Sequence, residues 1–267
     1  MKKFGLIAGD RNLPFAVRKW ADKNHIDLYI AGVKGCVDMA LFTDMKKSHY
    51  IIPHLSQLSK VIKFFKKNDV CEIVLAGGVN NSSIRITFDV IRLFSKLLFM
   101  KNRYDGILRL VIREFEKNGI KVVGIDDILT DSVIGKGVMT TARPSKKEMQ
   151  EIKDNLNGAF DIASRDVGQS VIIFDGSIIA VESFKGTDEL ILRASKIKNG
   201  KGGILIKVLK PHQERRADLP VIGVKTIQNL SDNGFSGIAV DAGNAIFEDK
   251  EAVLKLANDK NIFIIGV

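Results

Sequence analysis

The chain has 267 residues, of which 45% are hydrophobic and only five are proline, so it can bury one large core or two modest ones and is not disordered. Its 41 Lys and Arg residues against 31 Asp and Glu residues give a net charge of +10, which favours an anionic partner without choosing among nucleic acid, an anionic bilayer and a phosphorylated substrate. Cys36 and Cys71 have neither CxxC spacing nor a neighbouring histidine, which argues against a disulfide framework or a thiolate zinc site.

Membrane insertion and export are not expected. The early apolar run over residues 4–8 is too short for a signal peptide and is followed by Gly, Asp and Arg. No apolar run approaches the length of a transmembrane span. We therefore expect a cytoplasmic protein with reduced cysteines.

The first half of the chain alternates short apolar runs with longer helical patterns. Strands are predicted over residues 4–8, 26–31, 73–76 and 122–125, and helices over residues 14–24, 55–67, 84–100 and 107–117. This alternation predicts a parallel, Rossmann-like sheet. Residues 130–143 are rich in Gly, Thr and Ser and form the predicted linker, so we expect an N-terminal Rossmann-like domain over residues 1–133.

The second half has a different pattern. Ser145 followed by Glu148 three positions on predicts a capping box at a helix start, and Asp175-Gly176 between two apolar runs predicts a hairpin. The predicted elements are strands over 170–174, 177–181, 204–208, 238–241 and 262–265, and helices over 188–197 and 250–258. We expect residues 134–267 to form a catalytic α/β domain with a mixed sheet.

The segment from Lys207 to Pro220 is the most informative of the chain. This segment contains several cations, an amide and two carboxylates. Its two prolines disfavour a helix, which predicts a connecting loop. It follows an apolar run that predicts a buried strand, and ligands of α/β sheets bind beyond the carboxyl ends of strands. Arg215 and Arg216 suit phosphate oxygens, and Asp218 suits a hard metal ion or a water molecule. The alternative is a solvated charge run in a loop.

Three further segments place acidic or glycine residues at predicted helix starts. They are Gly186-Thr187-Asp188 preceded by Glu182, Asp105 in Asp105-Gly106-Ile107-Leu108-Arg109, and the turn in Gly5-Leu6-Ile7-Ala8-Gly9-Asp10-Arg11-Asn12-Leu13-Pro14. Gly77-Gly78 follows the third predicted strand in the same manner, and could form the other side of a crevice. For Asp188 the alternative is a helix-end charge beside Thr187 as N-cap, and for Glu182 it is an outward-facing strand end.

Taken together with the charged segment, these motifs resemble the LpxI family of UDP-2,3-diacylglucosamine pyrophosphatases. The other matching stretches are Asp166-Val167-Gly168-Gln169-Ser170-Val171, Asp218-Leu219-Pro220 with Ile222-Gly223 and Thr226, and Gly237-Ile238-Ala239-Val240 with Ala242-Gly243. The resemblance covers nearly the whole chain. The sequence departs from the family pattern at Asp10, Arg11, His212 and Glu214.

The resemblance implies Mg²⁺-dependent hydrolysis of the lipid-linked UDP-sugar to 2,3-diacylglucosamine 1-phosphate and UMP in lipid A biosynthesis. On this basis Asp218 and Asp188 are the expected catalytic and metal-binding carboxylates, and Lys210 and Arg216 the phosphate clamps. The expected substrate-binding residues are Gly9, Leu13, Pro14, Gly77, Asp105, Gln169, Glu182, Gly186, Thr187, Gln213 and Arg215. The alternative function is a non-hydrolytic nucleotide-binding or regulatory module.

The remaining expectations concern partners. Residues 84–103 combine large apolar side chains with arginine and lysine, which is typical of a core helix with a basic outer face or of a helix at a bilayer surface. We therefore expect transient contact with the inner-membrane surface. A nucleic-acid partner is not expected, because no stacking motif or recognition module is present. A homodimer is left open.

Overall fold

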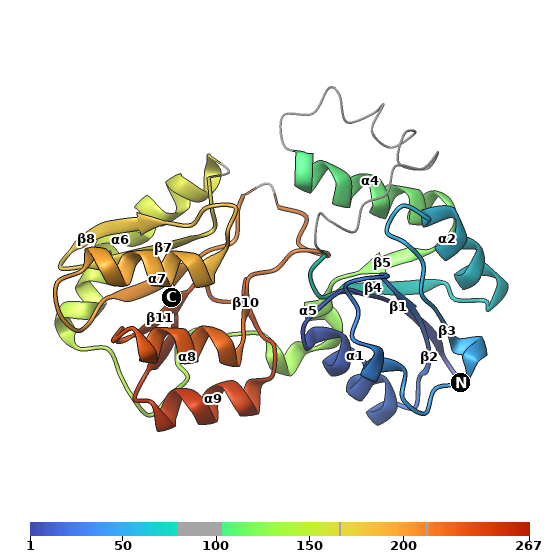
Figure 1. Cartoon of the computed structure of the whole chain (residues 1–267), viewed down its shortest axis with the longest axis horizontal. Coiled ribbons are helices and arrows are strands. Elements are labelled where there is room, and N and C mark those ends of the chain that lie inside the picture. Colours follow the sequence, from blue (N-terminus) through green and yellow to red (C-terminus); the bar gives the residue numbers. More distant parts are fainter. Residues whose placement is uncertain (80–102, 166, 212) are drawn as a thin grey trace. The chain divides into compact units, whose positions relative to one another are not determined.

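The computed structural model describes residues 1–79, 103–165, 167–211 and 213–267, and of residues 103–105 it describes the backbone alone. The helix predicted over residues 84–100 lies outside the described residues. Contacts divide the chain into an N-terminal unit, Met1–Thr130 with Glu214–Asp218, and a C-terminal unit, Asp131–Gln213 with Leu219–Val267 (Figure 1). Both units are of the α/β class, as the sequence predicts.

The N-terminal unit has a five-stranded parallel sheet in the order β3-β2-β1-β4-β5. The strands are β1 (Lys3–Ala8), β2 (Asp27–Gly32), β3 (Tyr50–Ile51), β4 (Glu72–Ala76) and β5 (Lys121–Val123). The helices are α1 (Leu13–Lys23), α2 (Leu58–Lys67), α4 (Arg103–Lys117) and α5 (Ile125–Ile128). The chain first builds outward from β1 through β2 to β3 and then crosses to β4, so β1 and β4 meet at a topological switch point.

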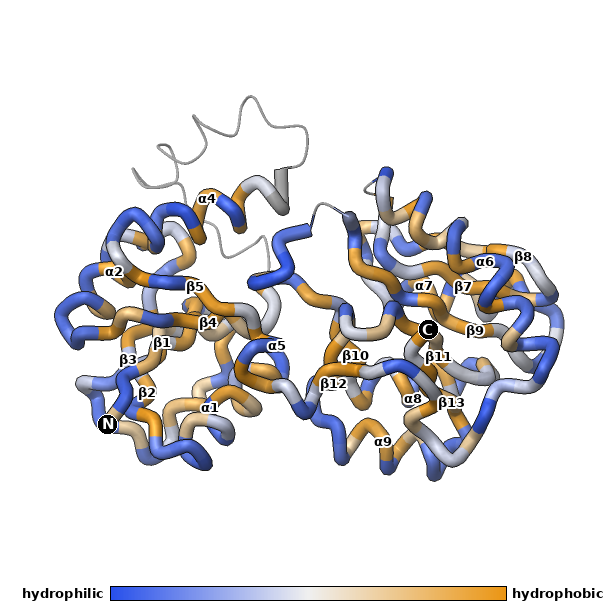
Figure 2. The backbone as a smooth tube through the Cα atoms, turned by 180° about the vertical axis from the view of Figure 1, so that it is seen from behind, coloured by the Kyte–Doolittle hydropathy of each residue, from blue (hydrophilic) through white to orange (hydrophobic). Residues whose placement is uncertain are grey.

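Hydrophobic periodicity explains how these elements pack. Helix α2 buries Leu58, Val61, Ile62 and Phe65, which recur at the spacing of one helical face. They join side chains from β4 and α4, including Ile73 and Phe115, in the core of this unit. Figure 2 shows hydrophobic residues concentrated along the strands of both units.

The C-terminal unit has a six-stranded mixed sheet in the order β6-β13-β11-β9-β7-β8 and a small parallel pair of β10 and β12. The strands are β6 (Gly137–Val138), β7 (Ser170–Phe174), β8 (Ser177–Val181), β9 (Ile204–Lys207), β10 (Val221–Ile222), β11 (Gly237–Val240), β12 (Ile246–Phe247) and β13 (Phe263–Gly266). The helices are α6 (Lys146–Ser164), α7 (Thr187–Ile197), α8 (Val224–Asp232) and α9 (Lys250–Asp259).

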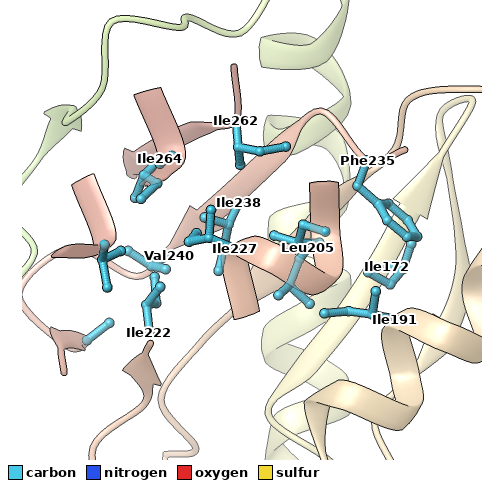
Figure 3. Close-up of a cluster of buried hydrophobic side chains, with 14 of the residues drawn as sticks. Ile172, Ile191, Leu205, Ile222, Ile227, Phe235, Ile238, Val240, Ile262 and Ile264 are labelled. Carbon is cyan, nitrogen blue, oxygen red and sulfur yellow. The ribbon is translucent and has the colours of Figure 1, made fainter. Parts of the chain in front are cut away.

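Both faces of the six-stranded sheet are buried. Leu205, Ile238 and Ile264 point to one face, where Ile191 of α7 and Ile227 of α8 pack against them (Figure 3). The alternate strand residues, such as Ile204 and Ile206, pack with Ile152 and Ala159 of α6. Burial on both faces explains why these strands read as continuous apolar runs.

Two local predictions are confirmed by the hydrogen bonds and dihedral angles. The Ser145 hydroxyl accepts from the Glu148 N–H at 3.2 Å, and the Glu148 carboxylate accepts from the Ser145 N–H at 2.8 Å. Asp175 and Gly176 have φ values of 48° and 77°, as a two-residue hairpin turn requires.

Other predictions need correction. Residues 130–143 are not an open linker, because β6 pairs with β13 and Ile134 is buried in the core of the C-terminal unit. The strand predicted over 122–125 ends at Val123, since Gly124 is the N-cap of α5. The described part of α4 begins at Arg103, so Asp105 lies inside the helix. Within the part of the chain that the structure describes, we find no helix with the length and apolar character needed to span a bilayer.

Candidate functional site

The glycine turns after β1 and β4 pack directly on each other at the switch point. The Gly9 N–H donates to the Ala76 carbonyl, and the Asp10 N–H to the Gly78 carbonyl, both at 2.8 Å. A Cβ on Gly9 would lie 2.1 Å from the Gly78 carbonyl oxygen, and one on Gly77, whose φ is +87°, 2.3 Å from the Asp10 oxygen. Close approach of the two backbones therefore requires both glycines.

Asp10 makes a side-chain hydrogen bond within this turn pair. Its carboxylate accepts from the Gly78 N–H at 2.8 Å. Leu13 and Pro14, which begin α1, are buried. The Asp10 carboxylate thus stabilises the turn pair and uses a backbone donor that glycine in its place would leave for other acceptors.

Ion pairs hold the segment Glu214–Asp218 within the N-terminal unit. Arg215 Nε donates to Asp126 Oδ2 at 3.0 Å, and Arg215 Nη2 forms an ion pair with the same oxygen at 2.9 Å. Arg216 bonds both oxygens of Glu214, at 2.9 and 3.2 Å, and Glu116 at 2.6 Å. Ala217 packs against the core between them. The segment belongs to this unit through side chains about 100 positions away along the chain.

The same ion pairs shift the titration of their members. The hydrogen bonds between Arg216 and Glu214 lower the pKa of the Glu214 carboxyl and raise the pKa of the Arg216 guanidinium. A phosphate gripped by Arg216 would therefore have to replace a carboxylate. Glu116 is the partner more easily released, because its side chain is 42% exposed and exposed pairs are worth little.

Asp218 is an exposed residue held by the backbone on both sides. Its N–H donates to the Glu214 carbonyl at 3.1 Å, and the adjacent Leu219 and Pro220 are buried. Since the neighbours are anchored, the backbone of Asp218 is held in place at the surface.

In the C-terminal unit, the predicted substrate-binding residues converge at one edge of the sheet. Strand β7 runs antiparallel to both β8 and β9, so the start of β7 lies beside the ends of β8 and β9. Gln169 precedes β7, Glu182 follows β8, and Lys207 ends β9. We define the carboxyl-edge cluster as Gln169, Glu182, Thr187, Lys207 and Gln213.

Hydrogen bonds join all members of this cluster. The Thr187 hydroxyl donates to Glu182 Oε1 at 2.6 Å and accepts from Lys207 Nζ at 3.2 Å. The Gln169 N–H donates to Glu182 Oε2 at 3.1 Å, and Gln213 Nε2 donates to Gln169 Oε1 at 3.4 Å. Glu182 and Lys207 are only 7% and 6% exposed, so the alternative of an outward-facing Glu182 is wrong.

Lys210 closes a turn with Gln213, a member of this cluster. The Gln213 N–H donates to the Lys210 carbonyl at 3.0 Å, and the Lys210 N–H donates to Gln213 Oε1 at 3.2 Å. The turn therefore fixes the backbone from which the Lys210 side chain extends.

Asp188 lies in the first turn of α7 and contacts α8. Its carboxylate is 2.6 Å from Lys225 Nζ and accepts from Asn229 Nδ2 at 2.9 Å. Gly186, with a φ of +84°, is the N-cap, so Thr187 is the first helical residue. These contacts support a helix-end role, and a metal ion at Asp188 would compete with Lys225.

The described residues offer few donor groups to a metal ion. No group of three or more His, Cys, Asp or Glu side chains suited to a metal ion occurs among the described residues. Mg²⁺ needs only one or two protein carboxylates when it also binds substrate phosphates and water. Asp218 is exposed and suits such a site, whereas a metal ion at Asp188 would have to displace Lys225.

A polar depression of about 510 Å³ lies elsewhere on the C-terminal unit. Gly202, Ser236 and Ile262, which line it, immediately or closely precede β9, β11 and β13. It is therefore at the opposite edge of the sheet from the carboxyl-edge cluster.

Lys207 begins the charged segment in the sequence, but no catalytic or binding role was predicted for it. The usable signal was a lysine at the end of an otherwise apolar strand, since lysine is seldom buried without a partner. Of the predicted residues, Gln169, Glu182, Thr187 and Gln213 are brought together, whereas Arg215, Arg216 and Asp218 belong to the other unit.

Comparisons with known proteins span nearly the whole chain. A family model of the LpxI N-terminal domain matches residues 3–132, and a model of the LpxI C-terminal domain matches residues 135–265. The curated UDP-2,3-diacylglucosamine pyrophosphatase LpxI of Caulobacter vibrioides is 28% identical over 278 aligned positions, which cover 100% of this chain and 98% of that protein.

Proposed function

Because the chain belongs to the LpxI family, we propose that it hydrolyses UDP-2,3-diacylglucosamine to 2,3-diacylglucosamine 1-phosphate and UMP in lipid A biosynthesis. The observation that carries this proposal is the ordered match of both family domains, from residue 3 to residue 265, together with the full-length relative of that name. A non-hydrolytic nucleotide-binding module remains the alternative that the experiment below tests.

The proposed reaction is attack of water on one phosphorus, with cleavage of the phosphoanhydride P–O bond and loss of a proton. When bound, Mg²⁺ would supply charge neutralisation at the pyrophosphate. We assign its protein ligand to Asp218 first and Asp188 second. Lys210 and Arg216 neutralise phosphate oxygens, and Gln213 positions the substrate. Exposure of Asp218 and the turn beneath Lys210 support these assignments.

The direct test is incubation of the full chain with the lipid nucleotide and Mg²⁺, with and without a chelator, while UMP is measured. We expect UMP release that the chelator abolishes and added Mg²⁺ restores, because a pyrophosphate needs its charge neutralised during attack. Tight nucleotide binding without UMP would support the non-hydrolytic alternative. UMP release in the presence of chelator would refute the metal dependence alone.

We also propose reversible contact with an anionic membrane surface. A diacylated substrate carries hydrocarbon whose exposure costs about 0.8 kcal/mol per CH₂, so the enzyme must meet it at the bilayer or shelter its chains. Support comes from the net charge of +10 and from the sequence of residues 84–103, which lie mostly outside the described residues. The cytoplasmic location and a homodimer remain predictions.

Vesicle sedimentation tests this contact. Binding to anionic vesicles should fall with added salt and with the paired changes Arg92→Glu and Lys96→Glu, because screening weakens attraction between exposed charges. Neutral vesicles provide the control. Equal recovery on neutral and anionic vesicles would contradict the electrostatic account.

A further inference from the structure

Lys207 is a buried cation whose position is set by the sheet. It is 6% exposed and pairs with Ser170 of β7 and Val240 of β11, so strands flank it on both sides. The Asp241 N–H donates to its carbonyl at 3.1 Å. Burying an ammonium group is costly unless hydrogen bonds compensate, so the acceptors of the Lys207 ammonium are essential to its position.

The Lys207 ammonium joins two segments of the candidate site. It donates to the Thr187 hydroxyl at 3.2 Å and to the Val221 carbonyl at 3.3 Å. Thr187 begins α7, and Val221 comes three residues after Asp218 along the chain. The Lys207 side chain therefore connects the first turn of α7 to β10, the strand that follows Asp218 along the chain.

The effect of Lys207 extends beyond the atoms that it touches. Because the Thr187 hydroxyl accepts from Lys207, its single proton is directed to Glu182 Oε1 at 2.6 Å. The other Glu182 oxygen receives the Gln169 N–H. A cation, a hydroxyl, a carboxylate and a backbone amide are thus aligned in one chain of hydrogen bonds.

We propose that Lys207 is a positioning residue for the hydrolysis, which fixes Thr187, Glu182 and Gln169 in the geometry that the substrate meets. This inference rests on the proposed function. Methionine at this position would keep similar volume and supply no donor, leaving the Thr187 hydroxyl free to rotate away from Glu182 and the Val221 carbonyl without this bond.

The experiment compares Lys207→Met with Lys198→Met in the full chain. Lys198 is a matched control, because it also donates to two acceptors, the Gly200 and Gly234 carbonyls at 2.8 and 3.2 Å, and its Nζ lies 4.6 Å from the Phe235 ring centroid. We expect Lys207→Met to lower kcat by about 10²-fold with little change in KM, as misplaced groups do. Lys198→Met should lower the melting temperature and leave kcat unchanged.

A double-mutant cycle and amide exchange separate positioning from general stability. Thr187→Val removes the hydroxyl at constant volume, so Lys207→Met should have a much smaller effect on kcat in that background. Hydrogen exchange at the Gln169 amide should accelerate in Lys207→Met and not in Lys198→Met.

Three results would overturn the proposal: unchanged kcat in Lys207→Met, equal kcat losses in both lysine variants, or additive effects of Lys207→Met and Thr187→Val. A wild-type chain that releases no UMP would refute the proposed function instead. In that case the Gln169 amide still reports whether Lys207 holds the cluster.

Discussion

Asp218→Ala is expected to reduce UMP release by about 10³-fold or more while changing the free energy of unfolding by no more than about 0.5 kcal/mol. The carboxylate is exposed, and the buried neighbours Leu219 and Pro220 anchor the segment without it. Its loss therefore removes a charged oxygen donor from the site and little packing. The measurements are initial rates of UMP release at saturating Mg²⁺ and thermal unfolding of the same samples.

Two other aspartate variants make this result interpretable. Asp259→Ala changes an exposed aspartate in the last turn of α9 and should leave the rate unchanged. Asp188→Ala should lower the rate and also the stability, by about 1 kcal/mol, because Lys225 and Asn229 lose their shared acceptor. Full activity in Asp218→Ala with an unchanged melting temperature would remove Asp218 from the site. If Asp188→Ala lowered the melting temperature and left the rate of UMP release unchanged, Asp188 would be a helix-end residue and would have no role in the site.

The sequence predicted those parts of the fold that depend on local chemistry. Ser145 and Glu148 make a capping box wherever a helix begins with them, and Asp175-Gly176 forms its turn from the freedom of its own backbone. By contrast, β6 consists of two residues that pair only because β13 lies beside them. A strand this short has no periodicity of its own, so the segment resembled a linker.

The sequence could suggest which residues form the candidate site. It could not predict their ion-pair and hydrogen-bond partners. Charged residues after β9 indicated a candidate region, since ligands of α/β sheets bind beyond the carboxyl ends of strands. The carboxylates that bind Arg215 and Arg216, Asp126 and Glu116, come from α5 and α4, and no local pattern connects them. For the same reason a glutamate at a strand end was given an outward-facing alternative, although Glu182 is buried and accepts hydrogen bonds from Thr187 of α7 and from the Gln169 N–H just before β7.

The proposed site residues belong to different units of the chain, so their roles can be tested on separated halves of the chain. The C-terminal half, residues 134–267, contains Asp218, Asp188, Lys210 and Arg216. The contacts of residues 214–218, however, are mainly with the N-terminal unit. Without residues 1–133, Arg215 loses Asp126, Arg216 loses Glu116, and Ala217 loses the core against which it packs.

We therefore expect neither half alone to release UMP, even though each half keeps its own buried core and should unfold cooperatively. The C-terminal half retains the carboxyl-edge cluster, so its Gln169 amide should stay protected from exchange while catalysis is lost. That combination would assign the loss to the Glu214–Asp218 segment, because misplacing a reacting group by about 1 Å is enough to cost 10²-fold in rate. Turnover at the full rate by residues 134–267 alone would show that the segment adopts its active geometry without Asp126 and Glu116, and that the N-terminal unit serves another purpose.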